Sequence, residues 1–186
     1  MTALTVANQL TLLRMLLIPA FVILVVYGYL GWALVIFAVA GATDALDGLI
    51  ARRAGQRTSL GAWLDPMADK LLLVTTFIVL TVPGLNLANR LPLWLTICII
   101  SRDVVIVATV AIVNLAIGPR TFRPSIYGKI ATATYIITAV AAMLFNYLGY
   151  HSAIVDLGIW LSLAITLISA FHYIWHARRI IDTPAS

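Results

Sequence analysis

Six long apolar segments alternate with short breaks along the chain. These segments are residues 10–28, 31–53, 59–81, 92–117, 126–148 and 153–177. Each contains about 20 or more mostly apolar residues, which is the length that an α-helix needs to cross a hydrocarbon layer about 30 Å thick. The pattern predicts an all-α, polytopic membrane protein with six transmembrane helices, organised as a single membrane domain over residues 1–186.

The first nine residues, MTALTVANQ, are mildly amphipathic. This pattern fits two alternatives, a short interfacial helix that lies on the membrane before the first span and a frayed terminus. The segment contains no basic stretch followed by a small-residue cleavage site, so we do not expect a cleaved signal peptide.

Hydrophobic residues make up 62% of the chain and charged residues only 10%. A soluble domain has about 45–50% apolar and about 25% charged residues, so the composition supports the membrane assignment. The net charge is +5, but the chain has no basic run and no aromatic–basic face, which argues against a nucleic-acid partner. The only cysteine, Cys98, lies in an apolar segment and cannot form a disulfide within the chain.

Basic residues are concentrated around the junctions after the second and fourth predicted helices and at the C-terminus. They are Arg52, Arg53, Arg57, Arg120, Arg123, Lys129, Arg178 and Arg179. The three other junctions contain only Arg90. Because cytoplasmic loops of membrane proteins are enriched in Lys and Arg, we expect both termini and the two basic junctions to face the cytoplasm.

Four of the seven acidic residues, Asp44, Asp47, Asp65 and Asp69, flank the junction between the second and third predicted helices. The members of each pair are three or four positions apart, so each pair shares a helix face. A turn over residues 54–58 would bring the two helix ends together.

Carboxylates in a membrane protein are costly unless they are paired or bind a cation. An all-oxygen ligand set suits Mg²⁺, Mn²⁺ or Ca²⁺, and two such ions can bridge a diphosphate. The sequence therefore predicts a divalent-metal site that holds a phosphorylated substrate and faces the cytoplasm. The alternative is an ion-pair network with Arg52, Arg53 and Lys70. One aspartate is also a candidate general base, and the spacing does not identify which one.

Small residues accompany the aspartates. Gly48 and Ala51 share a face with Asp44 and Asp47, and Gly61 precedes Asp65 by one turn, so a bulky ligand would find room beside both helices. Arg52 is suited to bidentate pairing with a phosphate. The alternative for the small residues is close packing between helices.

The complete spacing is Asp44-x2-Asp47-Gly48-x2-Ala51-Arg52-x8-Gly61-x3-Asp65-x3-Asp69. It resembles the signature of the CDP-alcohol phosphotransferase family at every signature position. The segments Asn8–Arg14, followed by Pro19, and Leu64–Lys70 resemble the phosphatidylglycerophosphate synthase and cardiolipin synthase branches of that family. The similarity runs along nearly the whole chain.

The resemblance implies a homodimeric enzyme of six membrane helices that transfers a phosphatidyl group from CDP-diacylglycerol to an alcohol and releases CMP. It implies that Asp44, Asp47, Asp65 and Asp69 bind Mg²⁺ (or Mn²⁺), as two ions, and that Asp69 also deprotonates the acceptor hydroxyl. Under the same resemblance, Gly48, Ala51, Arg52 and Gly61 line the CDP pocket. The expected location is a bacterial inner membrane.

Three further basic residues, Arg102, Arg123 and Lys129, are candidates for binding an acceptor phosphate. Arg102 falls inside the fourth predicted helix, where an isolated guanidinium is costly. The alternative is a structural pair of Arg102 with Asp103 or with the aspartate cluster. Adjacent residues on a helix point about 100° apart, which argues against a simple pair with Asp103.

The acceptor itself is open between two glycerol phosphates. Residues 124–132, PSIYGKIAT, resemble the P-S-x-x-G-K-x-x-T segment of members that use glycerophosphate. This resemblance supports a glycerol phosphate type acceptor, either free glycerol 3-phosphate, giving phosphatidylglycerophosphate, or the headgroup of phosphatidylglycerol. Ser101-Arg102-Asp103 is instead similar to the cardiolipin synthases, which would use phosphatidylglycerol. Residues 132–135, TATY, lack the glutamine common where free glycerol 3-phosphate is used.

Two other classes of protein fit parts of the pattern. A divalent-cation channel or transporter would use the same aspartates, but it needs polar residues that continue across the membrane. The far halves of the second and third predicted helices are almost purely apolar. An inert membrane scaffold gives no reason for the complete set of acids.

Overall fold

The structure is a computed structural model that describes the backbone of residues 6–54, 59–117 and 125–182. Within these ranges the side chains of some helical residues are outside the description. They are residues 6–8, 44–54, 59–66, 69, 110, 112–114, 116–117, 174 and 176–182.

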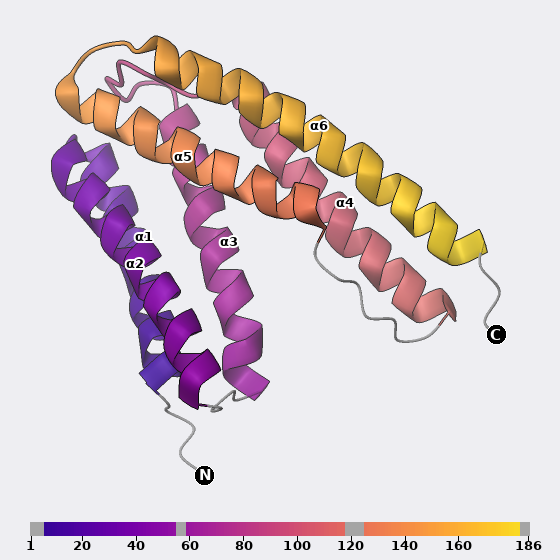
Figure 1. Cartoon of the computed structure of the whole chain (residues 1–186). Helices are drawn as coiled ribbons and strands as arrows, with labels where there is room; N and C mark the ends of the chain where they lie inside the picture. Colours follow the sequence, from indigo (N-terminus) through magenta and orange to yellow (C-terminus); the bar gives the residue numbers. More distant parts are fainter. Residues whose placement is uncertain (1–5, 55–58, 118–124, 183–186) are drawn as a thin grey trace. The chain divides into compact units, whose positions relative to one another are not determined.

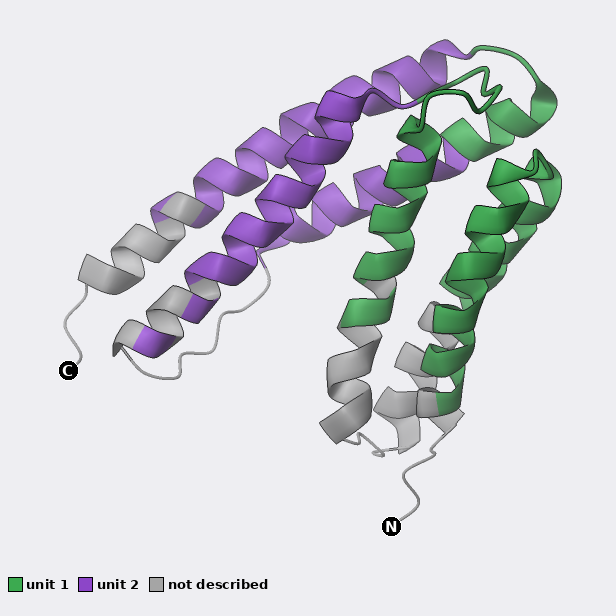
Figure 2. Ribbon diagram, turned by 180° about the vertical axis from the view of Figure 1, so that it is seen from behind, with its two compact units in different colours: residues 1–90, 142–151 green, residues 91–141, 152–186 purple. Residues whose placement is uncertain are grey.

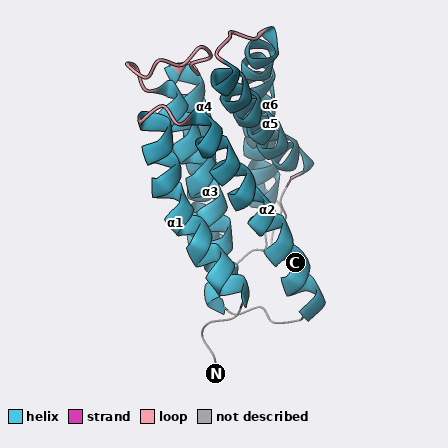
Figure 3. Ribbon diagram, turned by 90° about the vertical axis from the view of Figure 1, so that its left-hand side faces the viewer, coloured by secondary structure: helices cyan, strands magenta, loops and turns pink. Residues whose placement is uncertain are grey.

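Helices make up almost all of the described chain, and this part contains no strand (Figure 3). They are α1 (Val6–Val26), α2 (Leu30–Ala54), α3 (Ser59–Thr81), α4 (Leu93–Ile117), α5 (Ile126–Leu148) and α6 (Ala153–Asp182) (Figure 1). The all-α prediction is confirmed, and each predicted segment corresponds to one helix. The first helix begins earlier than expected, so residues 6–9 belong to α1 and not to a separate interfacial helix. Residues 1–5 lie outside the described part.

Three stretches of helix are long and apolar enough to cross a membrane, by length and composition. They are Gln9–Val26 in α1, Ile126–Leu148 in α5 and Ala153–Tyr173 in α6. Shorter apolar stretches cover Leu30–Thr43 in α2 and Lys70–Thr81 in α3. These stretches belong to the described residues only. The chain therefore has helices of membrane type, and the expected number of six membrane spans stays a prediction.

The chain divides into two compact units (Figure 2). Unit 1 contains residues 1–90 and 142–151, and unit 2 contains residues 91–141 and 152–186. Within unit 1, α1 packs against α2 and α3, and within unit 2, α4 packs against α6. Helix α5 contributes its C-terminal end to unit 1 and the rest to unit 2.

Glycine allows two of the sharp turns between helices. Gly28, between α1 and α2, and Gly149, between α5 and α6, both have φ of 78°, a left-handed conformation that glycine adopts without a Cβ clash. After α1 the amide of Tyr29 donates to the carbonyl of Leu24 at 2.8 Å, which satisfies a carbonyl at the helix end. The breaks predicted after residue 28 and after residue 148 are therefore confirmed.

Two asparagines in unit 1 tie the segment after α3 to the end of α5. The backbone amide of Asn89 donates to Oδ1 of Asn146 at 2.6 Å, and Nδ2 of Asn146 donates back to the carbonyl of Asn89 at 3.2 Å. Nδ2 of Asn89 also donates to the carbonyl of Tyr150 at 2.9 Å. Because both asparagines are buried, these bonds supply partners that water cannot.

Helix α6 has one face that is buried inside unit 2 and carries both apolar and polar side chains. The buried residues on this face follow each other at alternating intervals of four and three. They are Val155, Ile159, Ser162, Thr166, Ser169 and Tyr173. Hydroxyl contacts join this face to α5, because Tyr135 Oη lies 2.5 Å from Thr166 Oγ1 and Thr138 Oγ1 lies 3.1 Å from Ser162 Oγ. Such hydroxyl contacts between close helices are typical of association within membranes.

Candidate functional site

The candidate metal-binding aspartates are carried by two helices of unit 1. Asp44 and Asp47 lie in the C-terminal half of α2, and Asp65 and Asp69 lie near the start of α3. Because both segments are helical, intervals of three and four place each pair on one helix face. The side chains of all four lie outside the described residues, so their convergence stays a prediction. The donor chemistry, four carboxylates, fits a hard divalent cation.

The CDP-binding candidates share this position. Gly48, Ala51 and Arg52 follow the first aspartate pair in α2, and Gly61 precedes the second pair in α3. Their side-chain surroundings also lie outside the described residues. Elsewhere, among the residues whose side chains are described, no group of three or more His, Cys, Asp or Glu gathers as a metal site would require. Within the part of the chain whose side chains are described, the structure offers no alternative to the aspartate set.

Arg102, in α4, is held by two hydrogen bonds. Its Nη1 donates to Oδ1 of Asp103 at 2.7 Å, and its Nη2 donates to Oγ of Ser169, in α6, at 2.6 Å. The first bond corrects the expectation that neighbouring helix positions argue against this pair. The 100° rule describes the direction of the Cα–Cβ bond, and the long arginine side chain turns back far enough to reach its neighbour.

Arg102 and Lys129 line the same open pocket of about 520 Å³ in unit 2. The lining residues are Arg102, Ile106, Ser125, Gly128, Lys129, Thr132, Ala133, Ile136 and Tyr173. Two of the three candidate acceptor-binding residues are thus brought together, while Arg123 lies outside the described residues. Arg102 and Lys129 both carry hydrogen-bond donors that suit an anionic ligand.

Gly128 allows the guanidinium of Arg102 to lie close to the backbone of α5. A Cβ atom at this position would lie 3.2 Å from Nη2 of Arg102 and 3.3 Å from Oγ of Ser125, which is tighter than ordinary contact. Oγ of Ser125 accepts a 3.0 Å hydrogen bond from the amide of Gly128, as an N-cap does. The pocket therefore depends on a helix start, a cap and a glycine next to one another.

Ser125, Ser169 and Arg14 had no role predicted from the sequence. Ser125 carried a usable signal, because a serine directly before an apolar helical segment is a typical N-cap. There was no such signal in the sequence for Ser169, because it is one of several small polar residues in the last helix. Arg14, noted only within a resembling segment, is completely buried in α1, where a charged group needs compensation.

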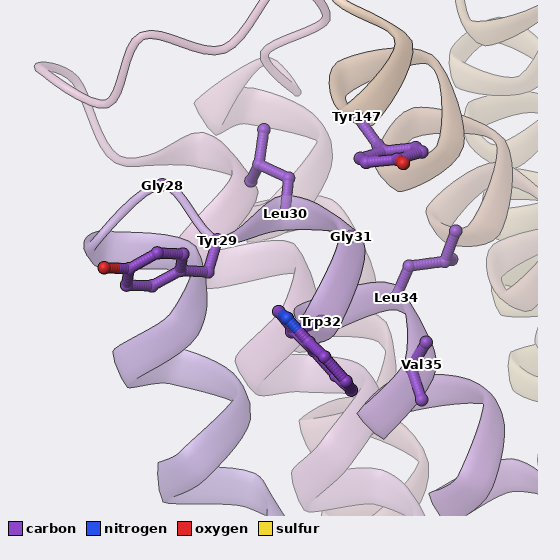
Figure 4. A pocket seen from close by; sticks show the side chains of 8 residues that line it. All are labelled: Gly28, Tyr29, Leu30, Gly31, Trp32, Leu34, Val35 and Tyr147. Carbon is purple, nitrogen blue, oxygen red and sulfur yellow. The ribbon is translucent and has the colours of Figure 1, made fainter.

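A second hollow, of about 650 Å³, lies in unit 1 at the turn between α1 and α2. Figure 4 shows the ring of Tyr147 beside Gly31, where a Cβ atom would lie 2.8 Å from Cε2 of that ring. Tyr29, Trp32 and Tyr147 line the hollow and are exposed, and no charged side chain is among its lining residues. Exposed aromatics of this kind are typical of a membrane–water interface, and the hollow lacks the cations that a phosphate needs.

Comparison with known proteins matches most of the chain to one family. The family model described as CDP-alcohol phosphatidyltransferase matches residues 4–172. The chain belongs to the CDP-alcohol phosphatidyltransferase family. The resemblance inferred from the aspartate spacing is therefore confirmed.

Curated relatives come from both branches that the sequence indicated. The chain is 34% identical over 195 residues to a human protein named cardiolipin synthase (CMP-forming), covering 96% of this chain and 63% of that protein. It is 38% identical over 148 residues to a probable phosphatidylglycerophosphate synthase of Mycobacterium tuberculosis, strain ATCC 25618 / H37Rv, covering 75% and 64%. A cardiolipin synthase (CMP-forming) of Streptomyces coelicolor is 37% identical over 117 residues, covering 60% and 52%. The chain thus spans less than two thirds of the length of these relatives.

Proposed function

We propose that this protein is a CDP-diacylglycerol-dependent phosphatidyltransferase of phospholipid biosynthesis. It transfers the phosphatidyl group to the hydroxyl of a glycerol phosphate acceptor and releases CMP. The acceptor is glycerol 3-phosphate, giving phosphatidylglycerophosphate, or phosphatidylglycerol, giving cardiolipin. The observation that carries the proposal is that Arg102 and Lys129 line one pocket in a chain that belongs to this family.

The donor is bound by the motif residues of α2 and α3. Asp44, Asp47, Asp65 and Asp69 hold two Mg²⁺ or Mn²⁺ ions, which when bound neutralise the charge of the diphosphate and of the leaving CMP. This assignment is supported by the all-carboxylate ligand set and the helical spacing of both pairs.

The CDP group lies against the small residues of the same helices. Gly48, Ala51 and Gly61 leave room for it beside the backbone, and Arg52 pairs with a phosphate oxygen. This part of the proposal is supported by the sequence spacing and the helical backbone of α2 and α3.

The transfer itself is a displacement at phosphorus. Asp69 accepts the proton of the acceptor hydroxyl, and the hydroxyl oxygen forms a bond to the phosphorus that carries the diacylglycerol. The bond between this phosphorus and the bridging oxygen of CMP breaks, and CMP leaves with that electron pair. Arg102 and Lys129, together with Arg123, bind the phosphate of the acceptor and so orient its hydroxyl.

The protein acts in a membrane as a homodimer of one family domain per chain. We propose that all six helices span the bilayer and that the termini and the aspartates face the cytoplasm. The apolar stretches of α1, α5 and α6 support the membrane assignment, and the distribution of Lys and Arg supports the orientation. The proposed location is the inner membrane of a bacterium.

An assay in lipid micelles tests the function. Purified protein receives CDP-diacylglycerol and Mg²⁺, with glycerol 3-phosphate or phosphatidylglycerol, and both CMP release and the lipid product are measured. We expect acceptor-dependent CMP release that falls by about 100-fold or more in Asp69→Asn, since loss of a general base costs at least that much. Asp156→Asn, an exposed acid of α6, serves as the matched control and keeps its activity.

Other outcomes would contradict specific parts of the proposal. Full activity of Asp69→Asn would show that another group takes the proton. Absence of CMP release with either acceptor, combined with Mg²⁺ flux into proteoliposomes, would instead favour the cation-transporter class.

A further inference from the structure

An acid, Asp103, is paired with Arg102, the buried cation that lines the acceptor pocket. We propose that Asp103 determines which phosphate the pocket accepts, so that a singly charged phosphodiester is preferred over a doubly charged phosphomonoester. The inference rests on the proposed transfer to a glycerol phosphate acceptor. It makes Asp103 a specificity-determining residue and the preferred acceptor a glycerol-bearing phosphodiester, the chemistry of a phosphoglycerol lipid headgroup.

The carboxylate of Asp103 is held next to the pocket residue Arg102. Its Oδ1 lies 2.7 Å from Nη1 of Arg102, and only 21% of the Asp103 side chain and 9% of the Arg102 side chain are exposed. Water therefore screens these charges less than it screens charges at an open surface. A phosphate bound by Arg102 lies within a few ångströms of this acid.

The two kinds of phosphate differ in how strongly they feel this carboxylate. A phosphomonoester carries about −1.5 to −2 charges at pH 7, whereas a phosphodiester carries a single negative charge. Coulomb repulsion is proportional to the charge of the ligand, so the carboxylate disfavours the monoester about twice as strongly. Arg102 and Asp103 together are formally neutral, which leaves Lys129 as the uncompensated cation among the described lining residues.

The walls of the pocket favour the same acceptor. Ile106, Ala133 and Ile136 line it alongside Arg102 and Lys129. Ile136 is exposed by 43%, so this wall of the pocket presents accessible apolar surface. An acceptor whose phosphate carries hydrocarbon places that hydrocarbon against these isoleucines, whereas a small free phosphate makes no such contact.

A variant of Ser169 distinguishes the effect of the pocket's charge from the effect of the position of the Arg102 guanidinium. Its Oγ accepts the other hydrogen bond of Arg102, at 2.6 Å, so it orients the guanidinium without changing the charge of the pocket. Ser169→Ala therefore weakens the binding of both phosphates alike, whereas Asp103→Asn alters their ratio.

The experiment compares three acceptors with the full chain in lipid micelles containing CDP-diacylglycerol and Mg²⁺. Glycerol 3-phosphate and glycerophosphoglycerol are both soluble and differ in phosphate charge, and phosphatidylglycerol adds acyl chains to the singly charged phosphate. The readout is the ratio of kcat/KM for glycerol 3-phosphate to kcat/KM for glycerophosphoglycerol. We expect this ratio to be below one in the wild type and to rise about tenfold in Asp103→Asn, as removal of one nearby charge predicts.

Lys129→Gln provides a second variant that does not touch the Arg102–Asp103 pair, since Lys129 is exposed on α5. It removes a positive charge from the pocket, so the same ratio should fall. A higher kcat/KM for phosphatidylglycerol than for glycerophosphoglycerol supports the contribution of the apolar wall.

The inference would be overturned if the wild type had a higher kcat/KM for glycerol 3-phosphate than for glycerophosphoglycerol. It would also be overturned if the ratio of these two values stayed unchanged in both Asp103→Asn and Lys129→Gln. The proposed function would stand in either case. If the wild type released no CMP with any of the acceptors, the proposed function itself would be contradicted. The two failures are thus distinguishable in one set of assays.

Discussion

Nη2 of Arg102 lies 2.6 Å from Oγ of Ser169, although the two residues are 67 positions apart in the chain. This hydrogen bond joins α4 to α6 and fixes one arm of the guanidinium, while Asp103 fixes the other arm. The buried arginine is therefore pre-oriented before a ligand arrives. Pre-orientation of this kind lowers the entropy lost on binding.

Replacing Ser169 with alanine should weaken acceptor binding. Loss of a hydrogen bond to a charged group costs about 1.5–3 kcal/mol, so we expect the KM for the acceptor to rise about tenfold or more. The KM for CDP-diacylglycerol should stay unchanged, and steady-state kinetics with either acceptor measures both. Ser101→Ala, an exposed serine of the same kind in α4, is the control. An equal loss in both variants would contradict the positioning role.

Gly128→Ala should disturb Arg102 directly. The new Cβ atom would lie 3.2 Å from Nη2, so the guanidinium must shift by a few tenths of an ångström. We expect an acceptor KM several-fold higher with little loss of thermal stability, because alanine is favoured over glycine in a helix by about 1 kcal/mol. Gly41→Ala, where a Cβ atom meets nothing within 4 Å, is the matched control in α2. Unchanged acceptor kinetics in Gly128→Ala would show that the space beside this glycine is not needed.

Gly158→Ala should create a steric clash between α6 and α5 within unit 2. Its Cβ atom would lie 2.8 Å from Oγ1 of Thr138, a distance that real Cβ contacts do not show. We expect a destabilisation of about 1–3 kcal/mol, typical of overpacking. The double variant with Thr138→Ala removes the clashing hydroxyl and methyl group and should recover part of this loss. Strictly additive effects in a double-mutant cycle of thermal stability would argue against the contact.

Asn146→Ala removes both hydrogen bonds between Asn146 and Asn89. The buried amide and carbonyl of Asn89 lose these partners, so we expect a loss of about 1–3 kcal/mol, which corresponds to a Tm lower by about 5 °C in a chain of this size. Thermal unfolding in detergent measures the change. Tyr147→Phe, an exposed neighbour that loses one hydroxyl, should leave Tm nearly unchanged. A similar Tm for wild type and Asn146→Ala would mean that the pair contributes little.

Metal removal should abolish transfer. A chelator that lowers free Mg²⁺ is expected to reduce CMP release by about 100-fold or more, because uncompensated charge on the diphosphate opposes departure of CMP. Restored Mg²⁺ should restore the rate in the wild type but not in Asp44→Asn, which lacks a proposed ligand. Asp156→Asn again controls for loss of an acid elsewhere. Activity that persists without divalent metal would refute the role of the aspartates.

The helices were predictable because their signals are local. A run of about 20 apolar residues implies a membrane-type helix wherever it occurs. The ends of these runs also located the turns at Gly28 and Gly149, where the backbone is left-handed. All six helices follow the expected segments within a few residues, except for the earlier start of α1 and the later end of α6. The aspartate spacing was equally local, and it identified the family that the comparison with known proteins confirmed.

The acceptor pocket was only partly predictable. Arg102 and Lys129 were recognisable because charged residues are costly in apolar segments. Ser169, Gly128 and the direction of the Arg102 side chain were not, since their roles depend on contacts between helices and on the reach of a long side chain. The sequence by itself determined the elements and the chemistry of the motif. Only the tertiary structure decided that Asp103 and Ser169 hold Arg102, because packing and side-chain conformation arise from the whole set of neighbouring atoms.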